Sequence, residues 1–128
     1  MDEFDWAQFI FLSEQLVKDS SNEAELRASI SRAYYAVFHI AIDKINEIDP
    51  SFKYSTSNIH KKVLDWFEIK SVSTHYGIKR MSDARKQADY EPNPRFPNPY
   101  VDMTELRSKA EEIISMGKSI IQQIKNLQ

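Results

Sequence analysis

The stretch SRAYYAVFH, from Ser31 to His39, places an arginine, three aromatic rings and a histidine in a segment that is typical of a helix. At about 100° per residue, Arg32 and His39 lie on one helix face, about 10 Å apart along the axis. An arginine binds a phosphate through its planar guanidinium, and a histidine acts as a general base near neutral pH. The spacing is therefore compatible with a catalytic pair, Arg32 and His39, with Tyr35 beside it.

The same stretch also fits a structural interpretation. Apolar residues within it and directly after it recur at helical spacing and would face a core, namely Tyr34, Val37, Phe38 and Ala41. Arg32, His39 and Asp43 would then form the solvated edge of the helix. The row His39, Asp43 and Glu47 does not predict a metal site, because three ligands from one helix give poor coordination geometry.

A second polar segment, KRMSDARKQADY, covers residues 79–90 and is the most basic window of the chain. Arg85 and Asp89 are one helical turn apart and can form an ion pair. The segment predicts either a surface helix with a local ion pair or a strip that binds RNA or a nucleotide. The candidate binding residues are Lys79, Arg80, Arg85, Lys86, Asp89, Tyr90 and, from the first stretch, Tyr35.

A third segment of interest, SNIHKKVLDWF, carries His60 next to two lysines near a helix start. We interpret His60 as a helix cap or an interface residue. Elsewhere no Ser-His-Asp set is recognisable, and two glycines are too few for a glycine-rich phosphate loop. These observations argue against conventional NTPases and hydrolases, and we expect no cofactor and no metal.

The composition limits the class of protein. A chain of 128 residues is the size of one domain, so we assign residues 1–128 to a single domain. The absence of cysteine excludes disulfides and thiol catalysis, and a formal net charge of −2 gives no global attraction for polyanions. An acidic N-terminus and the lack of a long apolar run predict a cytoplasmic protein without membrane association.

Hydrophobic periodicity and glycine scarcity predict an all-α, up-and-down bundle of about five helices. The expected helices cover residues 5–18, 23–48, 57–70, 77–89 and 104–127. Asn22 with Glu25, and Asp102 with Glu105, have the spacing of capping boxes. SVSTHYG, residues 71–77, is predicted to be a joint. The proline-rich residues 91–101 are predicted to form an extended loop, or a strap anchored by Phe96 and Tyr100.

Three segments in this order, SRAYYAVFHIA, IHKKVLDWF and ARKQADY, resemble the HEPN (higher eukaryote and prokaryote nucleotide-binding) superfamily, in particular its small stand-alone prokaryotic proteins. The similarity covers roughly residues 23–90. It implies a bundle of four main helices plus a shorter one, usually as a homodimer. Many members look like metal-independent endoribonucleases, often toxins paired with a nucleotidyltransferase antitoxin.

The resemblance also implies an active site made of an arginine, four to six residues, and then a histidine, usually on a later helix. Here the later segment has Asp89 near the expected histidine, and a carboxylate beside a phosphodiester is electrostatically unfavourable. We therefore expect a dimeric module that binds RNA, a nucleotide or a partner protein in a toxin–antitoxin or defence-type system. The alternatives are an endoribonuclease toxin that uses Arg32 and His39, or Arg85 with a residue from elsewhere, and a purely structural helical dimer.

Overall fold

The structure, a computed structural model, describes residues 3–19, 22–52, 57–92 and 102–128. These contain the helices α1 (Gln8–Asp19), α2 (Glu23–Ile48), α3 (Ile59–Lys70), α4 (Val72–Tyr90) and α5 (Met103–Lys125), and no strand. The predicted all-α bundle of five helices is confirmed. The predicted strap and its anchors Phe96 and Tyr100 lie outside the described residues, apart from Glu91 and Pro92. No helix in the described ranges is long and apolar enough to span a membrane.

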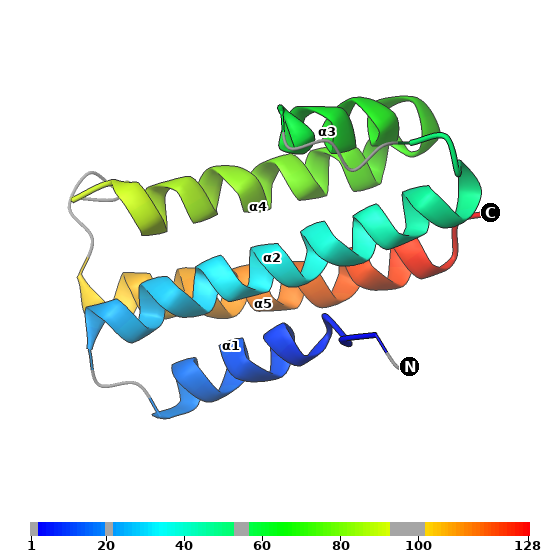
Figure 1. Cartoon of the computed structure of the whole chain (residues 1–128). Helices are drawn as coiled ribbons and strands as arrows, with labels where there is room; N and C mark the ends of the chain where they lie inside the picture. Colours follow the sequence, from blue (N-terminus) through cyan, green and yellow to red (C-terminus); the bar gives the residue numbers. More distant parts are fainter. Residues whose placement is uncertain (1–2, 20–21, 53–56, 93–101) are drawn as a thin grey trace.

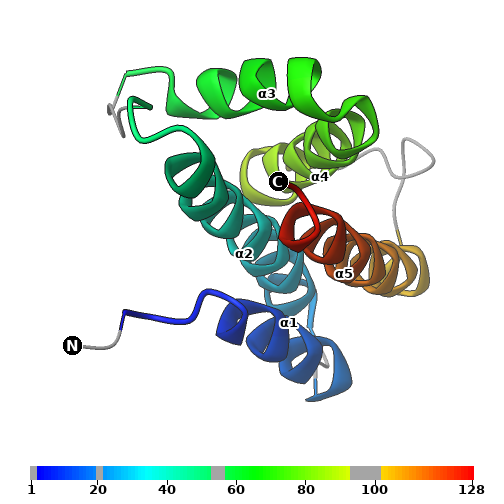
Figure 2. The same cartoon turned by 90° about the vertical axis from the view of Figure 1, so that its right-hand side faces the viewer.

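Helix α2 is the centre of the bundle and packs against all four other helices. It runs beside α5, while α1 and α4 lie on opposite sides of this pair and α3 lies outside α4 (Figures 1 and 2). Because α2 is covered on several sides, its apolar face is almost completely buried, and the residues predicted for that face are confirmed as core residues: Tyr34, Val37, Phe38 and Ala41.

Two helix starts follow the predicted capping signals. The Asn22 side chain accepts a hydrogen bond from the Glu25 backbone N–H at 2.9 Å, and Asp102 accepts one from the Glu105 backbone N–H at 2.8 Å. In a standard capping box the glutamate carboxylate accepts a hydrogen bond from the backbone N–H of the N-cap residue. Here the Glu25 carboxylate accepts one from the Asn22 side-chain amide instead, at 2.7 Å. Both caps give partners to backbone N–H groups that the first helical turn leaves without one.

The prediction of a joint over residues 71–77 was wrong, because Ser71 alone separates α3 from α4. The Ser71 N–H donates to the Phe67 carbonyl at 2.8 Å, and its side chain accepts from the Thr74 N–H at 3.4 Å. Thr74 is buried and donates to the Gln123 side chain of α5 at 3.0 Å. This packing against α5 keeps a serine- and threonine-containing segment helical despite its modest intrinsic propensity.

Arg27 of α2 forms hydrogen bonds with backbone carbonyls at the C-terminal end of α4. The sequence did not indicate this contact. The Arg27 guanidinium donates to the carbonyls of Ala88 at 2.9 Å, Glu91 at 2.7 Å and Pro92 at 3.0 Å. A cation at this position satisfies terminal carbonyls and complements the helix dipole. Arg27 thereby fixes the part of α4 that carries Tyr90.

Candidate functional site

Arg85 lies at the centre of a polar and aromatic group between α2 and α4, with only 6% of its surface exposed. Its guanidinium carbon is 5.4 Å from the ring centre of Tyr34, 5.5 Å from that of Tyr35 and 5.6 Å from that of Tyr90. Within the described residues its Nε has no hydrogen-bond partner. A buried arginine held mainly by ring faces is unusual and marks a candidate site.

Asp89 provides the counter-charge for Arg85. Its carboxylate lies 3.6 Å from the Arg85 guanidinium and accepts a hydrogen bond from Ser31 at 3.1 Å. The predicted ion pair is therefore present. It is not an exposed pair, because the side-chain exposures are 7% for Arg85 and 28% for Asp89.

His60, at the start of α3, belongs to the same group. Its Nδ1 is 2.6 Å from the Tyr34 hydroxyl, and its ring stacks on Phe38 at 4.2 Å. Burial raises the pKa of Tyr34 to about 12, so this hydroxyl keeps its proton near neutral pH. Burial, followed by the charges of Arg85 and Lys86, lowers the pKa of His60. We therefore assign Tyr34 as the donor to a neutral imidazole, which leaves the proton of His60 on Nε2.

Six residues from three helices make up this site, which we name the Arg85 cluster. Helix α2 contributes two rings, α3 one imidazole, and α4 the arginine, its carboxylate and an exposed ring. The members are Tyr34, Tyr35, His60, Arg85, Asp89 and Tyr90. The sequence indicated most of these residues but gave no reason to place His60 with them, because its contact with Tyr34 depends on how α3 packs against α2 and α4.

Arg32 and His39 share one side of α2, but each packs against aromatic rings. His39 stacks on Trp6, with ring centres 3.7 Å apart and an interplanar angle of 12°. The Arg32 guanidinium lies 5.1 Å from the Phe9 ring centre and 5.2 Å from that of Tyr35. Burial, and then the charge of Arg32, lowers the pKa of His39. These contacts indicate a packing role for both residues in the free chain.

The carboxylates that follow His39 on α2, Asp43 and Glu47, do not form a catalytic or metal-binding site with it. Among the described residues, no hydrogen bond joins Asp43 to His39, and Glu47 lies 3.8 Å from Lys44. The described part of the chain also contains no group of three His, Asp or Glu side chains arranged to hold a metal ion.

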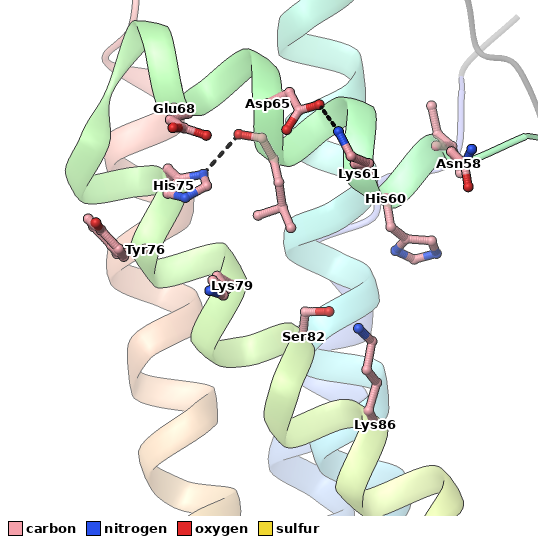
Figure 3. A pocket seen from close by; sticks show the side chains of 12 residues that line it. Asn58, His60, Lys61, Asp65, Glu68, His75, Tyr76, Lys79, Ser82 and Lys86 are labelled. Atoms are coloured by element: carbon pink, nitrogen blue, oxygen red, sulfur yellow. Dashed lines mark hydrogen bonds and ion pairs between the residues drawn. The ribbon is translucent and has the colours of Figure 1, made fainter.

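A cavity of about 750 Å³ lies between α3 and α4, next to the Arg85 cluster (Figure 3). His60 lines it from α3, and Lys79, Ser82 and Lys86 line it from α4. The three α4 residues follow helical spacing on one face. Neither lysine forms an ion pair with a described residue. We name this space the α3–α4 cavity.

The cationic side chains of the basic segment of α4 thus point in three different directions. Lys79 and Lys86 line the α3–α4 cavity, Arg85 points into the bundle, and Arg80 lies 3.5 Å from Glu112 of α5. The sequence grouped these residues as one strip, because a run of charges does not reveal which helix covers each face.

Comparison with family models, with curated proteins and with solved structures finds no match to this chain. What the protein does must therefore be inferred from the Arg85 cluster and the α3–α4 cavity. Lysines without ion-pair partners bind phosphates, and exposed tyrosine rings stack on unpaired bases. Together these groups suit a single-stranded nucleic acid.

Acidification between about pH 7.5 and about pH 5.5 should lower the free energy of unfolding through His39 and His60. Their folded-state pKa values are lowered, so below the ordinary histidine value the unfolded chain binds more protons. Stability is therefore complete above about pH 6.5 and decreases as the pH falls. Urea unfolding at several pH values measures this change, and replacing both histidines with glutamine should flatten it. A free energy that does not vary over this range would contradict the assignment.

Proposed function

We propose that the protein is a HEPN-like module that binds single-stranded RNA at the Arg85 cluster and the mouth of the α3–α4 cavity. The observation that carries this proposal is the convergence of Lys79, Lys86 and His60 on one cavity, with an exposed aromatic ring farther along α4. That ring belongs to Tyr90, which is 71% exposed and lies one helical turn after Lys86.

The chemistry of these groups favours RNA with unpaired bases. Each base has a flat face that stacks on an aromatic ring, and lysines contact phosphates without reading the sequence. A net charge of −2 means that binding depends on this local patch. The family resemblance supports the proposal, since its three segments lie on α2, α3 and α4, the helices that supply the Arg85 cluster.

We further propose, on the resemblance alone, that the module is a cytoplasmic homodimer that pairs with a nucleotidyltransferase-type antitoxin. Light scattering tests the dimer. Co-expression with a neighbouring nucleotidyltransferase gene tests the pairing, because an antitoxin relieves growth inhibition. If light scattering shows a monomer, the homodimer proposal is wrong, and no site can form between two copies of the chain.

A second candidate function is metal-independent RNA cleavage with His60 and Arg85. The observation that favours it is the single tautomer of His60, which presents Nε2–H while Tyr34 occupies Nδ1. In such a reaction the RNA 2′-hydroxyl attacks the adjacent phosphorus and the 5′-oxygen of the next nucleotide leaves with the proton. Incubating labelled RNA with wild type and His60→Ala in EDTA separates cleavage from binding alone.

Removing one charge from the α4 face that lines the cavity should weaken RNA binding. We expect Lys86→Gln to reduce affinity for a short single-stranded RNA about threefold to tenfold and to lower the salt slope by about one. Tyr90→Ala should cost about tenfold through the lost stacking. Fluorescence anisotropy over a salt series measures both effects.

The matched control is Arg80→Gln, which removes the same charge from α4 on the side that pairs with Glu112. It should leave RNA affinity within about twofold, because a distant surface charge contributes little at physiological salt. Equal losses from Lys86→Gln and Arg80→Gln would contradict a localised site and would indicate diffuse attraction to the whole helix.

A further inference from the structure

We infer that the α3–α4 cavity receives the terminal phosphate of the bound RNA, so that the protein prefers strands with a phosphorylated end. The inference rests on the proposed function and names the part of the RNA that enters the cavity. It depends on two observations, namely the junction of α3 and α4 near one end of the cavity and an uneven distribution of charge along it.

One end of the cavity lies near Ser71, where α3 and α4 join. The two helices run in opposite directions from it, so the start of α3 lies beside the later part of α4 (Figure 3). His60 and Lys86 accordingly line the same cavity, one from each helix. Nearer the junction, His75 Nδ1 lies 2.9 Å from the Leu64 carbonyl and joins the two helices. A strand that enters beside His60 and follows the cavity therefore runs toward this junction.

The charges along the cavity favour a phosphate at its α4 wall. Lys61 is neutralised by Asp65 at 2.7 Å, whereas Lys79 and Lys86 form no ion pair with a described residue. Glu68 lines the end near the junction and repels a polyanion there. The cavity therefore attracts an anion at Lys79 and opposes continuation of the strand beyond it.

A terminal phosphate fits this environment better than an internal one. A phosphate monoester carries about −1.5 to −2 charges near pH 7, whereas an internal phosphodiester carries one. Its additional terminal oxygen also accepts more hydrogen bonds from cationic donors. His60 adds an oriented N–H at the entrance, because the Tyr34 hydroxyl holds its other ring nitrogen.

The test compares one internally labelled single-stranded RNA in three forms, with a 5′-phosphate, with a 3′-phosphate, and with hydroxyls at both ends. We expect one phosphorylated form to bind about tenfold more tightly than the hydroxyl form. Lys79→Gln should weaken binding of the phosphorylated form more than binding of the hydroxyl form and so abolish this preference, because Lys79 is the cationic residue placed at the terminal phosphate. Glu68→Gln should strengthen binding of the preferred form.

The controls separate this inference from the proposed function. Arg80→Gln should retain the preference, since Arg80 pairs with α5. Equal affinity of the three forms, or a preference that survives Lys79→Gln, would overturn the inference while RNA binding itself stands. Failure of all three forms to bind would overturn both. Lys79 and Glu68 are exposed, so folding should not obscure the result.

Discussion

Replacing Gly117 with leucine should lower the free energy of unfolding by about 3 kcal/mol. Gly117 is buried on α5 where side chains of three other helices meet. A Cβ atom there would lie 3.2 Å from Met81 Cε, 3.4 Å from Ile10 Cδ1 and 3.5 Å from Val37 Cγ2. The remaining carbons of leucine have no space unless α5 moves away from the bundle. Urea unfolding followed by circular dichroism measures the loss.

Two variants control for this effect. Gly117→Ala adds one methyl group against the flexible end of Met81 and gains about 1 kcal/mol of helix propensity, so its net effect should be close to zero. Ser115→Leu places the same side chain at an exposed position of α5 and should change stability by less than about 0.5 kcal/mol. A Gly117→Leu protein as stable as wild type would show that the helices are not closely packed there.

The helices that begin with a clear chemical signal were predictable from the sequence. Asn22 and Asp102 each precede a glutamate at the spacing of a capping box, and α2 and α5 begin directly after them. By contrast, α3 begins after Asn58, whose φ is 57° and whose side chain makes no capping bond. The start of α4 was missed because Thr74 is stabilised by a partner on α5, which lies far away in the chain.

The candidate site was predictable as a set of residue types but not as an arrangement. Periodicity on α2 correctly separated the buried Tyr34 from the edge that includes Arg32 and His39, although that edge is half-buried. The sequence of α4 did not reveal that Arg85 points into the bundle, because nothing in a run of lysines and arginines distinguishes a buried cation from an exposed one. Nor did the sequence connect His60 to Tyr34, since the hydrogen bond joins helices whose relative placement no local pattern specifies.

Replacing Arg85 with methionine should reduce RNA affinity about tenfold while the fold is retained. Methionine fills much of the same volume, but the partly buried Asp89 loses its counter-charge, so the free energy of unfolding should also fall, by about 1–3 kcal/mol. Binding should suffer because Tyr35 and Tyr90 lose the cation that holds their rings, and Asp89 is left with an unbalanced negative charge. Anisotropy titration and urea unfolding of the same preparation separate the two effects.

The double variant Arg85→Met with Asp89→Asn distinguishes charge from ring positioning. Asparagine accepts the same hydrogen bond from Ser31 but does not repel phosphate. If the unbalanced carboxylate causes most of the loss, the double variant should recover about half of the lost binding free energy. If ring positioning dominates, affinity should stay at the level of Arg85→Met. An Arg85→Met protein with wild-type affinity would instead make Arg85 a stabilising residue of the fold, with RNA contacts confined to Lys86 and the exposed ring of Tyr90.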